Sequence, residues 1–244
     1  MFKLSHRLQT LESLISNQYH AIWDCCCDHG HLGMSLLTKF SDCGVAPKVH
    51  FVDIVPQLMM SIESKLTRFY PPQQFNWQVH CQDLNQLMLE KSEEPQLVVI
   101  AGVGGVLMAE FVTNIMQNNT QQRVDLLLCP VNDCHLLRQT LSKLGLSLKS
   151  EQIITENKRF YEIILVTNSP QLAYSLQEIE PISVIGDEMW HSECEIQQKI
   201  NQDYLTKVLA HHQRTQLSAA PTADKCFSDI IAQYQSLQSS FKDK

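Results

Sequence analysis

Residues 21–33 read AIWDCCCDHGHLG, a short apolar run that breaks into an acidic, histidine-bearing turn before a second apolar segment. This order predicts a buried strand that ends in a loop and leads into a helix. In an open α/β sheet, ligands bind in the crevice at the carboxyl ends of the strands. We therefore expect this loop to lie at the functional edge of the molecule.

Segments on either side of this stretch alternate between strand and helix patterns. A helix is predicted over residues 5–15, with Ser5 as its N-cap. Further strands are predicted at residues 48–53, 75–80, 96–101 and 124–129. Residues 146–155 and 160–166 are strand-like and are separated by a short turn, which predicts an antiparallel hairpin. The sequence thus predicts an α/β fold with a doubly wound, mostly parallel seven-stranded sheet.

The composition changes after Thr167, where an Asn-Ser-Pro sequence marks a candidate boundary. Beyond it, residues 196–208 and 227–241 each place apolar side chains on one helical face. Two such helices joined by a proline-containing turn predict an antiparallel helical hairpin. We therefore expect a sheet domain over residues 1–167 and a C-terminal helical domain over residues 168–244.

The overall composition restricts the class of protein. The chain has 244 residues, of which 44% are hydrophobic, and a formal net charge of −7. This charge argues against an extensive basic surface, so any phosphate-binding surface is expected to be a local patch. The nine cysteines are expected to be reduced thiols, because no signal peptide is recognised. No apolar run reaches the roughly 20 residues of a membrane span, and we expect a cytoplasmic protein.

Acidic side chains follow three of the predicted strands. They are Asp24 or Asp28 after the first strand, Asp53 after the second and Asp83 after the third. A carboxylate at the second strand end can accept hydrogen bonds from both ribose hydroxyls, and a side chain after the third can meet a base edge. A single acid at a strand end more often caps a helix, but three in register favour a nucleoside site. The glycine-rich residues 102–105 form either a tight turn or a ligand contact at the same edge.

Cysteine and histidine residues near the first strand have the composition of a metal site. However, adjacent residues on a strand point to opposite faces, so the thiols of residues 25–27 cannot converge on one ion with His29 and His31. The side chains of His211 and His212 should diverge in the same way and are predicted to be solvated. We expect no metal site.

Five blocks of sequence carry a further signal. They are Leu4–Leu8, Asp24–Leu32, Val99–Gly105, Pro130 with Arg138, and Glu156–Ile163. In order and content they resemble the blocks of the bacterial tRNA (adenine-N1)-methyltransferases that act at tRNA position 22, the TrmK group. The resemblance covers the sheet domain, and the helical hairpin is similar to that family's coiled-coil-like appendage. In the first loop the family has glycine where this chain has Cys26.

The resemblance implies a class I, Rossmann-like methyltransferase fold that binds S-adenosylmethionine at the strand ends. It places Asp53 at the ribose hydroxyls, Asp83 with Leu84 at the adenine, and residues 101–102 at the methionine part. The residues that it implies for cofactor binding are Asp24, Cys25, Cys26, Cys27, Asp28, His29, Asp53, Ile54, Asp83, Leu84, Ala101, Gly102, Gly104 and Gly105.

The resemblance also implies methyl transfer to N1 of an adenine in tRNA. Adenine N1 has an in-plane lone pair and is itself nucleophilic, so the reaction needs in-line placement more than a strong base. Asp28 and His29 are the implied catalytic residues, since a carboxylate can stabilise the cationic product. The residues implied to contact the tRNA are Arg7, Pro130, Asn132, Arg138 and Tyr161.

Two other functions stay open on the sequence. One is a class I methyltransferase with a different acceptor, such as another RNA, a protein or a metabolite. The other is a non-catalytic RNA- or nucleotide-binding protein with a degenerate site. The expected partner is tRNA, without a membrane or a metal, and the expected assembly is a monomer or a weak homodimer.

Overall fold

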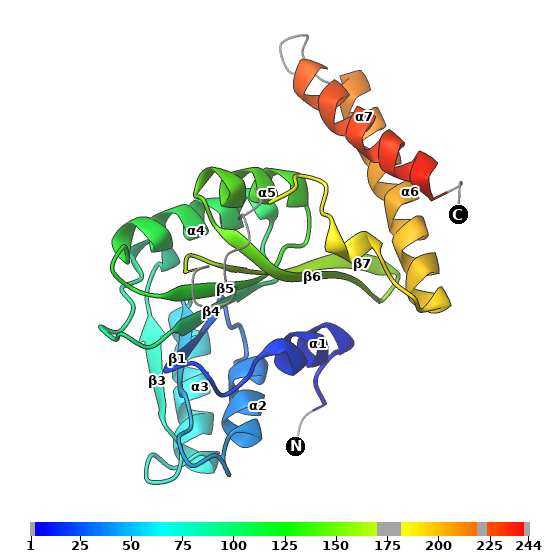
Figure 1. The fold of residues 1–244 in the computed structure, drawn as a ribbon. Helices are drawn as coiled ribbons and strands as arrows, with labels where there is room; N and C mark the ends of the chain where they lie inside the picture. Colours follow the sequence, from blue (N-terminus) through cyan, green and yellow to red (C-terminus); the bar gives the residue numbers. More distant parts are fainter. Residues whose placement is uncertain (1–2, 170–181, 219–223, 242–244) are drawn as a thin grey trace.

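A seven-stranded sheet forms the centre of the computed structural model, which describes residues 3–169, 182–218 and 224–241 (Figure 1). Its order is β3-β2-β1-β4-β5-β7-β6. The strands are β1 (Ala21–Cys25), β2 (Lys48–Asp53), β3 (Trp77–Cys81), β4 (Gln96–Ala101), β5 (Val124–Cys129), β6 (Ser147–Glu156) and β7 (Arg159–Thr167). Strands β1 to β5 are parallel, and β7 pairs antiparallel with both β5 and β6. The predicted doubly wound, mostly parallel sheet is confirmed.

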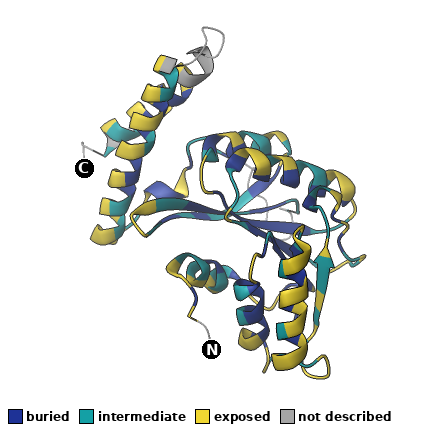
Figure 2. Ribbon diagram, turned by 180° about the vertical axis from the view of Figure 1, so that it is seen from behind, coloured by how far each residue is buried: buried dark blue, intermediate teal, exposed yellow. Residues whose placement is uncertain are grey.

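Helices cover both faces of this sheet (Figure 1). On one face lie α1 (His6–Leu14), α2 (His31–Lys39) and α3 (Pro56–Phe69), and on the other lie α4 (Gly105–Asn118) and α5 (Cys134–Lys143). Because both faces are covered, every residue of β5 is buried, which explains why its sequence is apolar at every position except Asp125. Figure 2 shows the buried residues along the sheet and on the inner sides of the helices.

The strand order contains a switch point between β1 and β4. The chain leaves β1 toward β2 on one side and later returns to β4 on the other side of β1. Loops that leave two such neighbouring parallel strands run in opposite directions and open a crevice at the carboxyl ends. The loop after β1 therefore lies at the predicted functional edge.

A helical hairpin stands against the β6 end of the sheet (Figure 1). It consists of α6 (Glu195–Ser218) and α7 (Asp224–Ser240), as the sequence predicts. Trp190, Tyr204, Leu205 and Tyr234 form an apolar cluster there, and it includes Ile153 of β6. The hairpin is thus packed on the sheet as well as on itself. The division at residue 167 stays a prediction, since residues 170–181 lie outside the described part.

Candidate functional site

The carboxylate of Asp24 ties β1 to the start of α2. It is only 5% exposed, and its Oδ2 accepts the Gly33 N–H at 2.9 Å. Burial raises the pKa of Asp24 to about 7, the hydrogen bond from Gly33 opposes this rise, and the negative charge of Asp53 adds to it. Asp24 is therefore an acid that titrates near neutral pH.

The raised pKa of Asp24 has a measurable effect on stability. The Asp24 carboxyl holds its proton up to about pH 7 in the folded protein, whereas an unfolded aspartic acid loses its proton near pH 4. The raised pKa therefore contributes stability that is fully present below pH 4 and is lost as the pH rises to 7. Between pH 5 and pH 8 the wild type should lose up to about 3 kcal/mol of unfolding free energy that an Asp24→Asn variant does not lose, because asparagine has no proton to release. Urea denaturation at both pH values measures this difference. Identical pH profiles of the two proteins would show that Asp24 is ionised throughout this range.

The loop after β1 is held in an unusual backbone conformation. Cys26 and Asp28 have φ values of 52° and 50°, in the left-handed region that costs a residue with a side chain on the order of 1–3 kcal/mol. Asp53 stabilises the loop, because its Oδ2 accepts the Asp28 N–H at 3.2 Å and its Oδ1 accepts the Val55 N–H at 3.1 Å. One carboxylate thereby joins the loops that follow β1 and β2.

The side chains of this loop point in different directions. Cys25 packs in the core under α4 and α5, and Cys27 packs in the core under α2 and α3. Their thiols are buried on opposite faces, and burial raises the pKa of both. Asp28 and His29 lie at the surface, with side chains 71% and 55% exposed and 3.7 Å between the carboxylate and the imidazole.

A cavity of about 290 Å³ opens beside this loop. We call it the strand-end pocket. Five residues predicted to bind a cofactor line it, namely Cys26, Asp53, Ile54, Asp83 and Leu84. Val103, Leu107 and Phe111 add apolar side chains to its lining. The pocket thus combines two carboxylates at strand ends with apolar walls, and their binding of a nucleoside stays a prediction.

The glycines after β4 serve two different purposes. Gly102 has a φ of 91°, which favours glycine. A Cβ on Gly104 would lie 2.7 Å from Asn132 Oδ1, and one on Gly105 would lie 2.4 Å from the Asp133 carbonyl oxygen. The Gly105 N–H also donates to the Asn132 carbonyl at 3.0 Å. Gly104 and Gly105 therefore pack the β4 loop against the β5 loop and do not line the strand-end pocket, so their contact with a cofactor stays a prediction.

Arg7 of α1, which precedes β1 in the chain, also lies at this edge of the sheet. Its guanidinium lies 5.0 Å from the ring centroid of Tyr161, and its backbone N–H donates to Glu156 at 2.9 Å. A Cβ on Gly102 would lie 3.9 Å from Arg7 Nη1. Arg7, which is predicted to contact the tRNA, is thus brought next to the β4 loop, with the predicted contact Tyr161 packed on its guanidinium.

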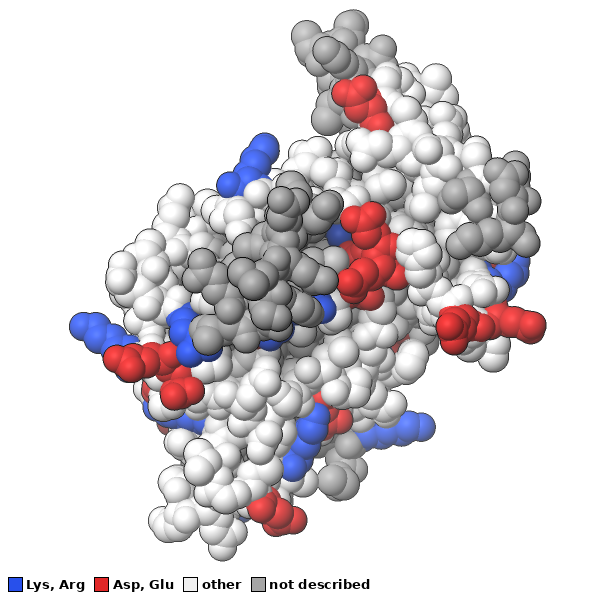
Figure 3. All heavy atoms as spheres, viewed as in Figure 1, with Lys and Arg blue, Asp and Glu red and all other residues white. Residues whose placement is uncertain are grey.

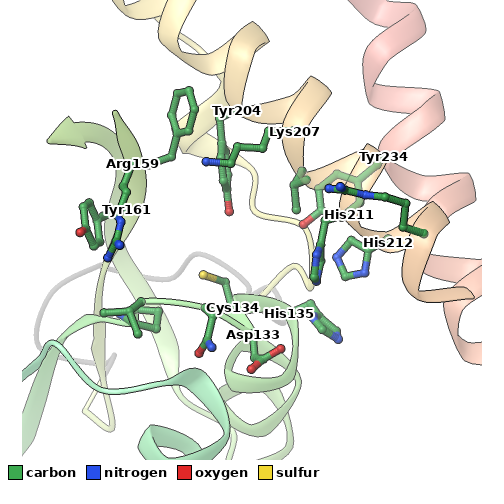
Figure 4. Close-up of a pocket in the computed structure, with 16 residues that line it drawn as sticks. Asp133, Cys134, His135, Arg159, Tyr161, Tyr204, Lys207, His211, His212 and Tyr234 are labelled. Carbon is green, nitrogen blue, oxygen red and sulfur yellow. The ribbon is translucent and has the colours of Figure 1, made fainter. Parts of the chain in front are cut away.

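A second cavity, of about 360 Å³, lies beside the loop after β5 (Figure 4), where Val131 donates its backbone N–H to the Val103 carbonyl at 3.0 Å. We call it the hairpin pocket, because its walls are residues 130–135, residues 159–161 and side chains of α6 and α7. The predicted tRNA contacts Pro130, Asn132 and Tyr161 line it. Sequence reasoning missed Lys207, His211 and Arg214 of α6, which line it too. Their shared helical face was visible in the sequence, but the surface that this face meets was not.

His212 does not face solvent as predicted. Its side chain is buried, stacked on Tyr234 with 5.6 Å between ring centroids and set edge-on against His135 at 4.7 Å. Burial lowers the pKa of His212 to about 4. The prediction was wrong because α6 packs its His212 face against α5 and α7, which leaves only His211 exposed.

The prediction that Arg138 contacts the tRNA is also wrong. Its side chain is 1% exposed, with Nε 2.7 Å from a Glu162 oxygen and Nη2 2.7 Å from a Glu151 oxygen. Burial alone would lower the pKa of Arg138, but the two carboxylates outweigh it and raise the pKa. Glu162 also accepts the Tyr204 hydroxyl at 2.5 Å. Arg138 is therefore the centre of a buried network that joins α5, the sheet edge and α6.

Charge on the visible face in Figure 3 is mixed, with Lys and Arg scattered among Asp and Glu. Within residues 3–169, 182–218 and 224–241, no group of three or more His, Cys, Asp or Glu side chains is placed to hold a metal ion. No helix in these ranges has both the length and the apolar character needed to cross a membrane.

Several known proteins are similar to this chain. The family described as methyltransferase domain matches residues 4–164, whereas no curated protein sequence matches. TrmK of M. capricolum, solved with S-adenosyl-homocysteine, has a TM-score of 0.73 at 17% identity, over 98% of this chain and 99% of that chain. The 1-methyladenosine-22 tRNA methyltransferase TrmK of B. subtilis has a TM-score of 0.72 at 20% identity, over 98% and 100% of the two chains. A protein of the NADB-Rossmann superfamily from Streptococcus agalactiae has 0.70 at 17% identity, over 97% and 98%.

The solved structures establish a shared fold over almost the whole chain, including the helical hairpin. The family match begins before α1 and ends within β7, so it includes both the loop after β1 and the glycines after β4. Because this match spans more than half of the chain, the protein is a member of the methyltransferase domain family.

Proposed function

We propose that the protein transfers a methyl group from S-adenosylmethionine to N1 of an adenine in tRNA, at position 22 by its likeness to TrmK. The observation that carries this proposal is a pair of neighbouring pockets, joined where Val131 of the hairpin pocket donates its backbone N–H to the carbonyl of Val103 in the strand-end pocket. One has strand-end carboxylates suited to a nucleoside cofactor, and the other is lined by polar and aromatic side chains suited to an acceptor base. The fold shared with two TrmK proteins supports it.

The residues of the strand-end pocket fit an adenosyl group. Asp53 stands at the end of β2, where its carboxylate can accept hydrogen bonds from two ribose hydroxyls. Ile54, Leu84 and Val103 provide apolar walls for a flat base. The bound cofactor supplies an electrophilic methyl group on a positively charged sulfur.

The acceptor side has to position a nucleophile. Adenine N1 lies on the Watson-Crick edge, so the base must be unpaired or flipped out before it can react. In the hairpin pocket the Asn132 amide can hydrogen-bond a base edge, and the Tyr161 ring offers a stacking surface. The Asp28 carboxylate, at the surface beside Asp53, is proposed to stabilise the positive charge of the product, and the neighbouring His29 is proposed to contact the base.

Nucleoside analysis tests the proposal directly. The full chain is incubated with methyl-labelled cofactor and bulk tRNA, and the digested tRNA is analysed by mass spectrometry. Label in 1-methyladenosine is the expected result. Label in another nucleoside or in a non-RNA acceptor would favour the alternative acceptors, and calorimetry without cofactor binding would favour a non-catalytic protein. With tRNA as its substrate, the protein is proposed to act in the cytoplasm, as a monomer or a weak homodimer.

A Cys26→Gly substitution should improve cofactor binding. Glycine adopts the left-handed φ of residue 26 without steric cost, and it removes a side chain from the wall of the strand-end pocket. We expect about tenfold tighter binding of S-adenosylmethionine in calorimetry, which corresponds to about 1.4 kcal/mol. A Cys26→Ala variant separates the two causes, because it clears the wall but keeps the backbone strain. Weaker binding by the glycine variant would mean that the thiol contacts the cofactor favourably.

A further inference from the structure

The face of α6 that borders the hairpin pocket carries positive charge. Lys207, His211 and Arg214 are four and three residues apart, a spacing that places them on one side of a helix. All three are exposed. Arg159 of β7 lines the same pocket and is exposed as well. In a protein with a net charge of −7, the pocket is lined by three side chains with a permanent positive charge, Arg159, Lys207 and Arg214, against the single carboxylate of Asp133.

Aromatic rings lie directly beside these charges. The Lys207 ammonium is 5.2 Å from the ring centroid of Phe160, within the range of a cation–π contact. Figure 4 shows Lys207 extending from α6 over the pocket and His211 pointing from α6 toward α5. Tyr161 and Tyr204 complete this part of the wall. Cations and aromatic rings around one pocket are the combination by which proteins hold single-stranded nucleic acid.

The position of α6 over the pocket is fixed by buried contacts. The Tyr204 hydroxyl donates to Glu162 of β7 at 2.5 Å, and the Gln197 amide donates to the Ile153 carbonyl of β6 at 2.8 Å. Tyr204 lies less than one turn before Lys207. The cationic face is therefore held in place on the sheet edge and does not depend on a mobile appendage.

We propose that Lys207 and Arg214, together with Arg159 across the pocket, bind the RNA phosphates that flank the acceptor adenosine. This inference rests on the proposed function and specifies it, because it makes the helical hairpin part of the substrate site. Lysine binds a phosphate as a point charge, and arginine can bind it through two parallel N–H groups. The occupant is thus the sugar-phosphate backbone of an unpaired segment of tRNA, next to the base that enters the pocket.

A pair of double variants of the full chain tests the inference. Lys207→Gln with Arg214→Gln removes two charges from the pocket, and Arg68→Gln with Lys91→Gln removes two exposed charges near the amino ends of the strands. The pocket variant should raise KM for tRNA about tenfold, with kcat and cofactor affinity within twofold of the wild type. The slope of log K for tRNA binding against log salt should fall by about 1.4, for two single-strand phosphate contacts. The distant variant should behave as the wild type.

Equal KM values and salt slopes for the two double variants would overturn the inference. Thermal melting shows whether each variant is folded, and Arg159→Gln on the opposite wall provides an independent third measurement, with an expected rise in KM of severalfold. The proposed function fails in a different way, if the wild type forms no 1-methyladenosine. In that case filter binding of tRNA, which needs no turnover, still compares the same variants.

Discussion

Replacement of Arg138 by methionine is expected to destabilise the fold by about 3–5 kcal/mol. The substitution leaves the carboxylates of Glu151 and Glu162 in the protein interior without the guanidinium that neutralises them. A buried charge without its partner costs far more free energy of unfolding than an ion pair on the protein surface contributes. Chemical denaturation followed by circular dichroism measures the loss directly.

Two further variants make the result for Arg138 specific. Arg68→Met removes an exposed guanidinium, so it should change stability by less than about 0.5 kcal/mol. Adding Glu162→Gln to Arg138→Met removes one of the unpaired charges and should recover part of the lost stability. If Arg138→Met is as stable as the wild type but binds tRNA poorly, then this arginine reaches the RNA after all.

An Asp53→Ala variant is expected to bind S-adenosylmethionine about 100-fold more weakly, a loss of about 2.7 kcal/mol. Hydrogen bonds to a charged carboxylate contribute about 1.5–3 kcal/mol each, and the proposed cofactor offers two ribose hydroxyls. The variant also loses the hydrogen bonds from the Asp28 and Val55 N–H groups, which hold the pocket loops in place. Calorimetric titration of the purified protein gives both affinity and stoichiometry.

An Asp53→Asn variant is the matched control. The amide keeps the shape of the side chain and one acceptor oxygen, so we expect a loss of about tenfold, which is intermediate between alanine and the wild type. If Asp53→Ala binds the cofactor as tightly as the wild type, the cofactor does not contact the end of β2. The Rossmann-like assignment of the strand-end pocket would then be wrong.

The sequence predicted the sheet well where a strand is buried on both faces. The bounds of β2, β4 and β5 agree residue for residue with the prediction, because each strand has a mostly apolar sequence that is buried on both faces. Strand β3 is at the sheet edge and half-exposed, and it begins at Trp77, later than predicted. The location of the strand-end acids at one edge of the sheet was predictable as well, because the carboxyl ends of parallel strands lie at the same edge.

The sequence could not reveal where a charged side chain finds its partner. Arg138 has the pattern of an exposed helical residue, and its burial depends on Glu151 and Glu162, which reach it only through the packing of α5 on the β6–β7 hairpin. The buried state of His212 depends likewise on α7 and α5. The burial of Arg138 and of His212 depends on tertiary packing, which helical periodicity in the sequence does not report.

The close fit of Gly104 and Gly105 against Asn132 and Asp133 limits how this protein can diverge in evolution. A new side chain at Gly105 would collide with the backbone of the β5 loop, whereas one at Gly104 would only displace the Asn132 side chain, and a change in the path of the loop would break its backbone contact with Gly105. The packing of the β4 loop against the β5 loop therefore tolerates little change in sequence. A change in acceptor preference is therefore expected to occur through the exposed side chains of β7 and α6 that line the hairpin pocket.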